Sequence, residues 1–267
     1  MKHEADKAIG IFDSGVGGLT VYRELARLLP QENLLYLGDT ARVPYGTKSR
    51  EVVLKYALQN SLYLLDQGVK LIVVACNTAS AFALPYLQAR LKAPILGVIE
   101  PGAWAAVTRT KNSRVGIIGT EGTIRSGAYE SALHKLRPAI SCVAKATGLF
   151  VPYIEENLTT PELLTPLFDH YLKSMKTSGV DTLILGCTHY PLLKAPLETY
   201  LGPGISLVDS AETTAHAVYE LLQVQGLASS GEKSAVNRVC VTDAPERVAS
   251  IAERFLGTSV EVEKVSI

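Results

Sequence analysis

"LIVVACNTASA", residues 71–81, is an apolar run that ends at a cysteine and continues into polar and small residues. A short run in which nearly every residue is apolar is typical of a parallel β-strand that is covered on both faces. A second stretch, "LILGCTHYPLL" at residues 183–193, has the same order of features. We therefore expect two matching strands, the first ending at Cys76 and the second at Cys187.

Similar apolar runs predict the strands of the fold, at residues 8–12, 33–38, 70–75, 94–99, 114–119, 182–186, 205–209 and 238–243. Amphipathic stretches lie between them, such as residues 19–29 and 244–256. Asp243 and Glu246 predict a capping box at the start of the second of these helices. Strands that alternate with helices predict an α/β fold with a parallel sheet. Residues 226–235, "GLASSGEKSA", are typical of a flexible linker.

An internal repeat relates the two halves of the chain. "IGIFDSGVGGLT" at residues 9–20 resembles "VGIIGTEGTIRS" at residues 115–126, and residues 71–80 resemble residues 183–192. The repeat predicts two similar parallel-sheet α/β domains that face each other across a cleft. Ligands bind such sheets beyond the carboxyl ends of the strands. Because both cysteines lie at such ends, we expect the active site in this cleft, with one thiol from each domain.

Composition excludes several classes of protein. Lys and Arg together number 26, as do Asp and Glu, and a formal net charge of zero argues against nucleic-acid binding. The start, "MKHEADKAIGIF", carries charges where a signal peptide needs an apolar core, and no apolar run approaches a membrane span. We therefore expect a cytoplasmic protein without a membrane partner. The four cysteines form no CxxC pair, which argues against a structural zinc site and favours free thiols.

Two thiols at matched strand ends suggest a particular chemistry. Free cysteine is among the most buried residue types, so either cysteine alone could be a core residue. However, an unperturbed thiol has a pKa near 8.5 and can exchange a proton around neutral pH. Two thiols on opposite faces of one carbon could remove a proton from one side and return one on the other. A racemase without a cofactor needs this arrangement.

Polar residues beside the two cysteines could activate them. His189 follows Cys187 by two positions and could exchange a proton with it, or could simply be a turn histidine. Asp13 ends the first apolar run, where it could cap the helix that begins near Gly17 and also bring its carboxylate near Cys76.

The glycines of "GVGG" do not bind a dinucleotide. Gly15, Gly17 and Gly18 do not match the spacing of the G-x-G-x-x-G fingerprint, and the chain contains no Walker A sequence. They favour instead the approach of backbone N–H groups to a small anion, such as a substrate carboxylate, at a helix N-terminus. No lysine is evident as an attachment point for pyridoxal phosphate. We therefore expect neither a cofactor nor a metal.

Two further segments could contribute polar groups. Residues 39–49, "DTARVPYGTKS", follow a predicted strand and could present Tyr45 and Gly46 in a rigid turn, or could be an ordinary surface turn. Thr120 and Thr123 of "GTEGTI" could be helix caps or hydroxyl donors.

These stretches together resemble the cofactor-independent aspartate/glutamate racemase family, and within it the enzymes that interconvert L- and D-glutamate. The resemblance covers nearly the whole chain and rests, in order, on "IFDSGVGG", "LGDTARVPYG", "ACNTASA", "GTEGTI", "FVPYIEEN", "LGCTHYPLL" and "VDSAETTA". It implies a supply of D-glutamate for peptidoglycan synthesis and a homodimer. It also implies that the carboxyl-terminal segment returns to the first domain, which would then comprise residues 1–97 and 210–267, with residues 98–209 forming the second.

The resemblance also implies roles for individual residues. Cys76 would act on D-glutamate with help from Asp13, and Cys187 on L-glutamate with help from His189. Asp39 and Glu155 would be further acidic residues of the catalytic site, although the context of Glu155, "ATGLFVPYIEEN", departs from the family pattern. The implied substrate-binding residues are Asp13, Ser14, Tyr45, Gly46, Asn77, Thr78, Thr120, Thr123, Thr188 and His189.

Three other functions remain open from the sequence. The same chemistry could act on aspartate or a hydantoin. A thiol hydrolase could use Cys187, His189 and Glu155, but it would leave Cys76 unexplained. A two-domain binding protein without catalysis would need neither thiol.

Overall fold

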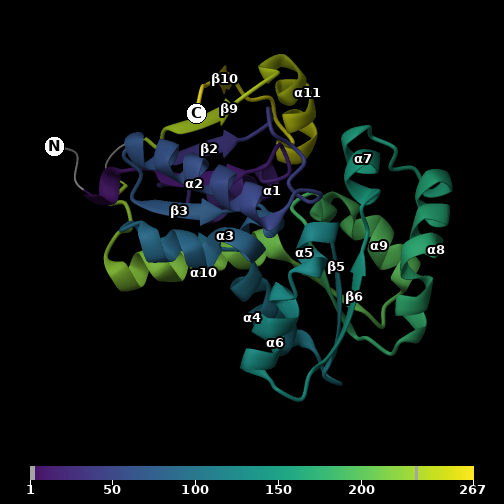
Figure 1. Cartoon of the computed structure of the whole chain (residues 1–267). Helices are drawn as coiled ribbons and strands as arrows, with labels where there is room; N and C mark the ends of the chain where they lie inside the picture. Colours follow the sequence, from purple (N-terminus) through teal and green to yellow (C-terminus); the bar gives the residue numbers. More distant parts are fainter. Residues whose placement is uncertain (1–3, 232–233) are drawn as a thin grey trace.

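The computed structural model describes residues 4–231 and 234–267 and contains two parallel β-sheets (Figure 1). The first sheet has six strands in the order β10-β9-β2-β1-β3-β4. Their bounds are β1 (Ile9–Asp13), β2 (Leu34–Gly38), β3 (Leu71–Val74), β4 (Ile95–Gly97), β9 (Asn237–Val241) and β10 (Val262–Lys264). The carboxyl-terminal strands β9 and β10 therefore extend the sheet that the amino-terminal strands begin.

The second sheet has four strands in the order β6-β5-β7-β8. Their bounds are β5 (Arg114–Gly119), β6 (Ser141–Ala146), β7 (Thr182–Gly186) and β8 (Ser206–Asp209). This order repeats the order β2-β1-β3-β4 of the first sheet, strand for strand, and all pairs are parallel. The predicted α/β pseudo-repeat is confirmed, and β3 and β7 occupy equivalent positions.

Helices cover the sheets. Their bounds are α1 (Leu19–Leu28), α2 (Arg50–Asp66), α3 (Asn77–Arg90), α4 (Ile99–Arg109), α5 (Glu121–Arg125), α6 (Ala128–Leu136), α7 (Phe150–Glu155), α8 (Pro161–Thr177), α9 (Lys194–Leu201), α10 (Ser210–Gln225) and α11 (Pro245–Leu256), with 3-10 helices η1 (Glu4–Asp6) and η2 (Tyr190–Leu193). Helix α1 packs against α10 and α11, α2 packs against α3, and α4 packs against α6 and α10. Figure 1 shows α11 at the upper right of the first sheet, on the side that faces α7 of the second half.

The core explains why the strands are apolar on both faces. Along β3, Leu71 and Val73 face one apolar cluster, whereas Ile72 and Val74 face another. The cluster that holds Leu71 also includes Leu183 of β7, so the two halves share one core. Burial of both faces leaves only the strand ends free for polar chemistry.

Every predicted strand corresponds to a strand of the structure, with ends that differ by a few residues at most, but β6 and β10 were not predicted. Strand β6 is an edge strand with exposed Ser141 and Lys145, so it lacks the continuous apolar run that marks a central strand. Strand β10 is a three-residue edge strand without a buried residue. Neither strand has the continuous apolar run from which the other strands were predicted.

The predicted capping box of α11 is wrong. The helix begins at Pro245 after Ala244, which adopts a left-handed conformation with φ of 50° and makes no side-chain cap. Asp243 instead accepts a hydrogen bond from Lys264 Nζ at 3.1 Å. Asp13 does not cap α1 either, because this helix begins at Leu19 without a side-chain cap.

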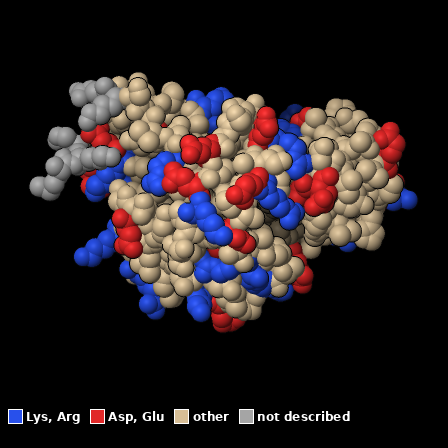
Figure 2. Space-filling model, turned by 90° about the horizontal axis from the view of Figure 1, so that it is seen from above, with Lys and Arg blue, Asp and Glu red and all other residues tan. Residues whose placement is uncertain are grey.

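The predicted linker at residues 226–235 contains no helix or strand where the structure describes it, and residues 232–233 lie outside the described residues. None of the helices in the described part of the chain is long and apolar enough to cross a membrane. On the face shown in Figure 2, acidic and basic side chains are interspersed, in keeping with the zero net charge.

Candidate active site

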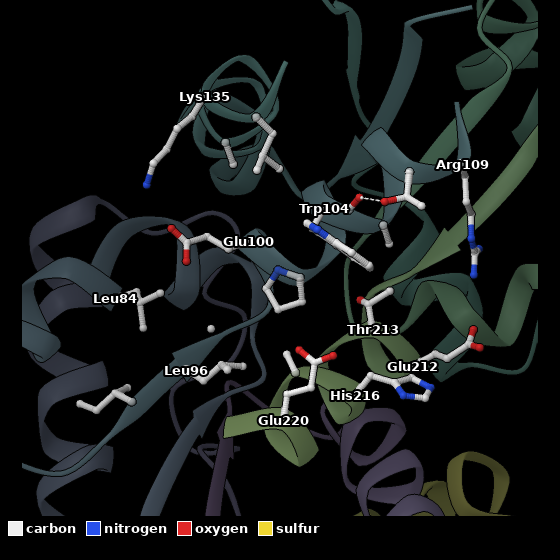
Figure 3. A pocket seen from close by; sticks show the side chains of 18 of the residues that line it. Leu84, Leu96, Glu100, Trp104, Arg109, Lys135, Glu212, Thr213, His216 and Glu220 are labelled. Carbon is white, nitrogen blue, oxygen red and sulfur yellow. Dashed lines mark hydrogen bonds between the residues drawn. The ribbon is translucent and has the colours of Figure 1, made fainter. Parts of the chain in front are cut away.

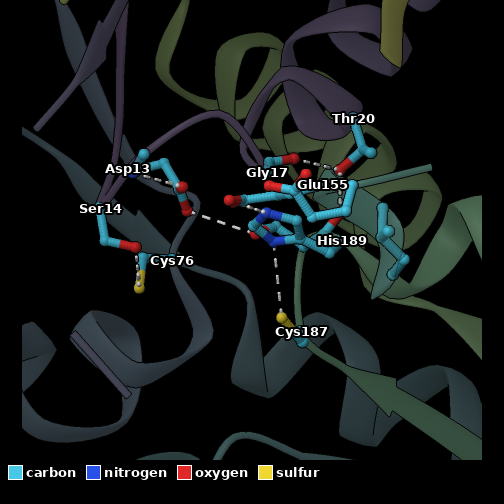
Figure 4. A network of polar contacts seen from close by, with 12 residues as sticks. Asp13, Ser14, Gly17, Thr20, Cys76, Glu155, Cys187 and His189 are labelled. Atoms are coloured by element: carbon cyan, nitrogen blue, oxygen red, sulfur yellow. Dashed lines mark hydrogen bonds and ion pairs between the residues drawn. The ribbon is translucent and has the colours of Figure 1, made fainter. Parts of the chain in front are cut away.

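The two matched strand ends bring the two predicted thiols to one site (Figure 4). Cys76 follows β3 and is the N-cap residue of α3, where its Sγ accepts a hydrogen bond from Ala79 N at 3.5 Å. Cys187 follows β7 of the other sheet. Their exposed fractions are 6% and 5%. The thiols are close enough that charge on Cys187 raises the pKa of Cys76.

His189 and Glu155 surround Cys187. His189 Nδ1 lies 3.8 Å from Cys187 Sγ, and His189 Nε2 lies 2.9 Å from Glu155 Oε1. Burial lowers the pKa of His189, but its hydrogen bonds to Cys187 and Glu155 outweigh this effect and raise the pKa to about 10. The hydrogen bond to His189 lowers the pKa of Glu155. The pair therefore carries an imidazolium and a carboxylate at neutral pH.

Cys76 has a different environment. Its Sγ lies 3.7 Å from Ser14 Oγ, with the thiol as donor. Burial raises the pKa of Cys76 to about 12, and the negative charge of Asp13 adds to this effect. This thiol is therefore protonated at neutral pH.

Asp13 connects the two halves of the site. The carboxylate accepts hydrogen bonds from Gly15 N at 2.9 Å and from Thr188 Oγ1 at 3.4 Å, and Thr188 follows Cys187. Burial raises the pKa of Asp13, and the nearby positive charge of His189 opposes this shift. Asp13 thus influences Cys76 through its charge, not through a hydrogen bond.

The glycines of "GVGG" allow this close approach. A Cβ atom added at Gly17 would lie 2.3 Å from both His189 Nδ1 and Thr188 Oγ1, and one added at Gly18 would lie 2.5 Å from Asp13 Cβ. Thr20 Oγ1 also donates to Thr188 O at 2.9 Å. The loop of the first half therefore packs directly on the residues that surround Cys187.

Three predicted substrate-binding threonines form a hydroxyl cluster between the halves. Thr78 Oγ1 lies 2.8 Å from Thr120 Oγ1 and 3.2 Å from Thr123 Oγ1, and the last two lie 3.0 Å apart. Thr120 is also the N-cap residue of α5, so it has both of the predicted roles. Gly46 adds a backbone contact, because its carbonyl accepts a hydrogen bond from Gly122 N at 2.8 Å.

Asn77 lies directly after Cys76 and is buried. Its Nδ2 donates to the hydroxyl of Tyr129 at 2.9 Å. Among the residues that the structure describes, no group donates to Asn77 Oδ1. This buried amide oxygen therefore keeps an unused acceptor position.

Asp39 and Tyr45 belong to a neighbouring network. Asp39 is fully buried and accepts hydrogen bonds from Arg42 Nε at 2.7 Å, from Thr242 Oγ1 at 3.2 Å and from the hydroxyl of Tyr45. Asn60 Nδ2 donates to the same hydroxyl at 3.1 Å. The hydrogen bonds of Asp39 thus hold the loop that carries Tyr45 and Gly46, and none of them reaches a thiol.

Residues 9–218 match the sequence profile of the Asp/Glu/Hydantoin racemase family. The chain belongs to this family. It is 50% identical to a glutamate racemase of Geobacter metallireducens over 98% of its own length and 97% of that protein. The solved glutamate racemase structures that it resembles include an isoform from Bacillus anthracis (TM-score 0.95, 39% identity, 99% of each chain) and the Francisella tularensis enzyme in complex with D-glutamate (TM-score 0.92, 38% identity, 98% of each chain).

Two residues beside the site were not predicted from the sequence. The ring of Phe255 meets the ring of His189 edge-on at 5.5 Å, and Arg254 Nη2 donates to the carbonyl of Glu155 at 2.6 Å. Both residues lie on α11, far along the chain from their contacts. Phe255 lies on the apolar face of a predicted helix and Arg254 in its last turn, and neither position indicates what the residue contacts.

A cavity of about 650 Å³ lies elsewhere in this racemase-family chain, lined by α3, β4, α4, α6 and α10 (Figure 3). Trp104, Glu100 and Glu220 line it, but none of the predicted site residues does. Within residues 4–231 and 234–267, no group of three or more His, Cys, Asp or Glu side chains is placed to hold a metal ion.

Proposed function

We propose that the protein interconverts L-glutamate and D-glutamate by proton transfer at two thiols, without a cofactor. One observation carries the proposal: each of two repeated sheets delivers a buried cysteine to a shared site, and each cysteine has its own polar neighbours. The relatives that are named glutamate racemases support glutamate as the substrate.

The charges in the site indicate how the reaction begins. His189 Nδ1 lies 3.8 Å from Cys187 Sγ, and on this contact we assign the Cys187 sulfur as the base that takes the α-proton of L-glutamate. The C–H bond breaks, its electron pair remains on the α-carbon, and Cys76 delivers its own proton to the opposite face. Cys187 is then a thiol and Cys76 a thiolate, which is the form that accepts D-glutamate. Exchange of protons with solvent restores the first form.

Stabilisation of the carbanion-like transition state requires nearby donors, because the α-proton of glutamate is only weakly acidic. The hydroxyls of Thr78, Thr120 and Thr123 already face one another and can turn to the carboxylates of glutamate. The Oδ1 atom of Asn77, which accepts no hydrogen bond from the described residues, is suited to the substrate ammonium group. Ser14, Tyr45, Gly46 and Thr188 complete the proposed binding residues.

The remaining assignments are part of the same proposal. Asp39 is a positioning residue that fixes Tyr45, whereas Asp13, Glu155 and His189 assist the thiols. Residues 1–97 and 210–267 form one domain and residues 98–209 the other. The protein forms a homodimer in the cytoplasm, binds neither nucleic acid nor membrane, and supplies D-glutamate for peptidoglycan synthesis.

Circular dichroism of the substrate tests this proposal. Purified protein, dialysed against a chelator, is incubated separately with L-glutamate and with D-glutamate. Both signals should decay to zero from opposite signs. Aspartate and a hydantoin serve as alternative substrates, and a decay confined to one of them would reassign the substrate. An unchanged signal with all substrates would contradict a racemase.

A further inference from the structure

Helix α11 follows β9 of the first sheet but contacts the acid–base residues of the second half. It packs against α1, and Arg23 Nη1 of α1 donates to the carbonyl of Phe255 at 3.0 Å. The carboxyl-terminal end of α11 is thereby fixed to the first half. Its side chains then extend to Glu155 of α7 and to His189, which belong to the second half.

Arg254 holds the end of α7. Its Nη2 donates to the carbonyl of Glu155 at 2.6 Å and its Nη1 to the carbonyl of Ile154 at 3.3 Å. The last carbonyls of a helix have no partner within the helix, so a guanidinium that binds two of them helps to fix that end, together with Asn157 N, which donates to the Ile154 carbonyl at 3.1 Å. Glu155 is the last residue of α7, and its carboxylate binds His189 Nε2. The position of Arg254 therefore determines the position of the carboxylate.

Phe255 supports the imidazole itself. Its ring is fully buried and meets the His189 ring at 5.5 Å with an interplanar angle of 87°. A Cβ atom added at Gly17 would collide with the same imidazole, so the loop of the first half is also in close contact with the ring. Small rotations of the ring would change the 3.8 Å distance from Nδ1 to Cys187 Sγ.

We propose that Arg254 and Phe255 are positioning residues for proton transfer at Cys187, Arg254 by fixing the backbone of Glu155 and Phe255 by fixing the ring of His189. The hydrogen bonds of Arg254 go to α7 and not to a thiol, and the ring of Phe255 meets His189, not a polar atom of the site. The inference deepens the proposed function and rests on it: the first half of the molecule, through α11, sets the geometry of the base in the second half.

The test separates positioning from general destabilisation. Arg254→Ala removes both backbone hydrogen bonds. Arg247→Ala is the matched control, because Arg247 lies on the same helix and pairs with the side chain of Glu156 at 3.6 Å, with its own side chain 68% exposed. Both variants remove one positive charge that lowers the pKa of Glu155. Only Arg254→Ala releases the backbone of α7.

The primary isotope effects on kcat/KM for α-deuterated L-glutamate and α-deuterated D-glutamate, both measured in H₂O, are the decisive readout. Deuterium in the L-isomer is transferred only at Cys187, and deuterium in the D-isomer only at Cys76. If Arg254→Ala slows transfer at Cys187, kcat should fall about tenfold or more. The isotope effect should then rise for the L-isomer and fall towards one for the D-isomer. Arg247→Ala should match the wild type in all these values.

A merely structural role gives a different result. Loss of folded protein lowers kcat in both directions and leaves both isotope effects at their wild-type values, and that result would overturn the inference. Arg254→Lys, which retains the positive charge and one donor nitrogen, should restore part of the rate. Phe255→Leu, which retains an apolar side chain, should change the isotope effects as Arg254→Ala does. The effect should rise for the L-isomer and fall for the D-isomer. If the wild-type protein does not racemize glutamate, the proposed function itself fails, before any variant is compared.

Discussion

The Cys76 half and the Cys187 half have the same strand order but opposite electrostatics. Cys76 lies near the carboxylate of Asp13 and has a pKa raised to about 12, whereas Cys187 lies beside an imidazolium. The repeat thus places two thiols symmetrically, and the residues around them differentiate an acid from a base. In the proposed mechanism one thiol is the acid and the other the base at the start of each turnover, and the two exchange these roles when the direction of the reaction reverses.

Deuterium oxide provides the most complete test of this division of roles. The first thiolate keeps the proton that it removes, while the second thiol delivers one that came from solvent. Newly formed D-glutamate should therefore carry α-deuterium from the first turnovers, and the remaining L-glutamate should stay largely undeuterated. Mass spectrometry of both isomers at low conversion measures this. Retention of the original proton in the first product would indicate a single shared base.

Replacement of either thiol should remove the acid–base group on one face of the substrate α-carbon. Cys76→Ser and Cys187→Ser should each lower racemization in both directions by about 10²–10⁴-fold, because a hydroxyl is a poor acid–base group at neutral pH. Substrate circular dichroism measures the rates. The control variant replaces Cys142 and Cys240 by Ala and should remain active. Near-normal racemization by either Ser variant would rule out the two-thiol mechanism.

A smaller effect is expected from the contact between the halves at Gly17. In Gly17→Ala, the new Cβ would lie 2.3 Å from His189 Nδ1, so the imidazole must move. We expect kcat to fall about tenfold to a hundredfold, since displacements near 1 Å have effects of this size. Gly148→Ala is the matched control, because its Cβ would meet no atom within 4 Å. Equal rates in the two variants would show that the ring position is unimportant.

The raised pKa of His189 predicts a pH-dependent stability. The folded-state pKa is about 10 and the ordinary value is 6.5, so the stabilisation is complete below pH 6.5 and is lost as the pH rises through about 10. Urea unfolding of the wild type and of His189→Gln, compared at several pH values in this window, measures the effect. The difference in unfolding free energy should shrink by at most about 1.4 kcal/mol per pH unit. A constant difference would contradict the charged imidazole.

The sequence was informative wherever burial or local spacing determines structure. Both cysteines were found because an apolar strand ends abruptly at each, and the repeat followed from comparing these ends. Strand β6 was missed because its exposed Ser141 and Lys145 interrupt the apolar pattern. The placement of Glu155 came from the resemblance, and the structure brings this residue within 2.9 Å of His189.

Other features of the structure could not be predicted from local sequence patterns. Asp243 has the spacing of a capping residue, but its carboxylate pairs with Lys264 of β10, an element that was not predicted. Arg254 and Glu155 are 99 positions apart, so nothing near either residue indicates their contact. Such contacts depend on how the two sheets are placed, which is set by the shared core rather than by any one segment.

The discontinuous first sheet has a consequence for folding during synthesis. Strand β2 pairs with β1 on one side and with β9 on the other, and β9 is translated only after the entire second sheet. At ribosomal speeds of about 5–20 residues per second, the edge of Leu34–Gly38 stays unpaired for many seconds. An open strand edge can pair with other chains. The nascent protein is therefore most exposed to aggregation while its second half is being made, and it completes both the sheet and the support of His189 only with its final segment.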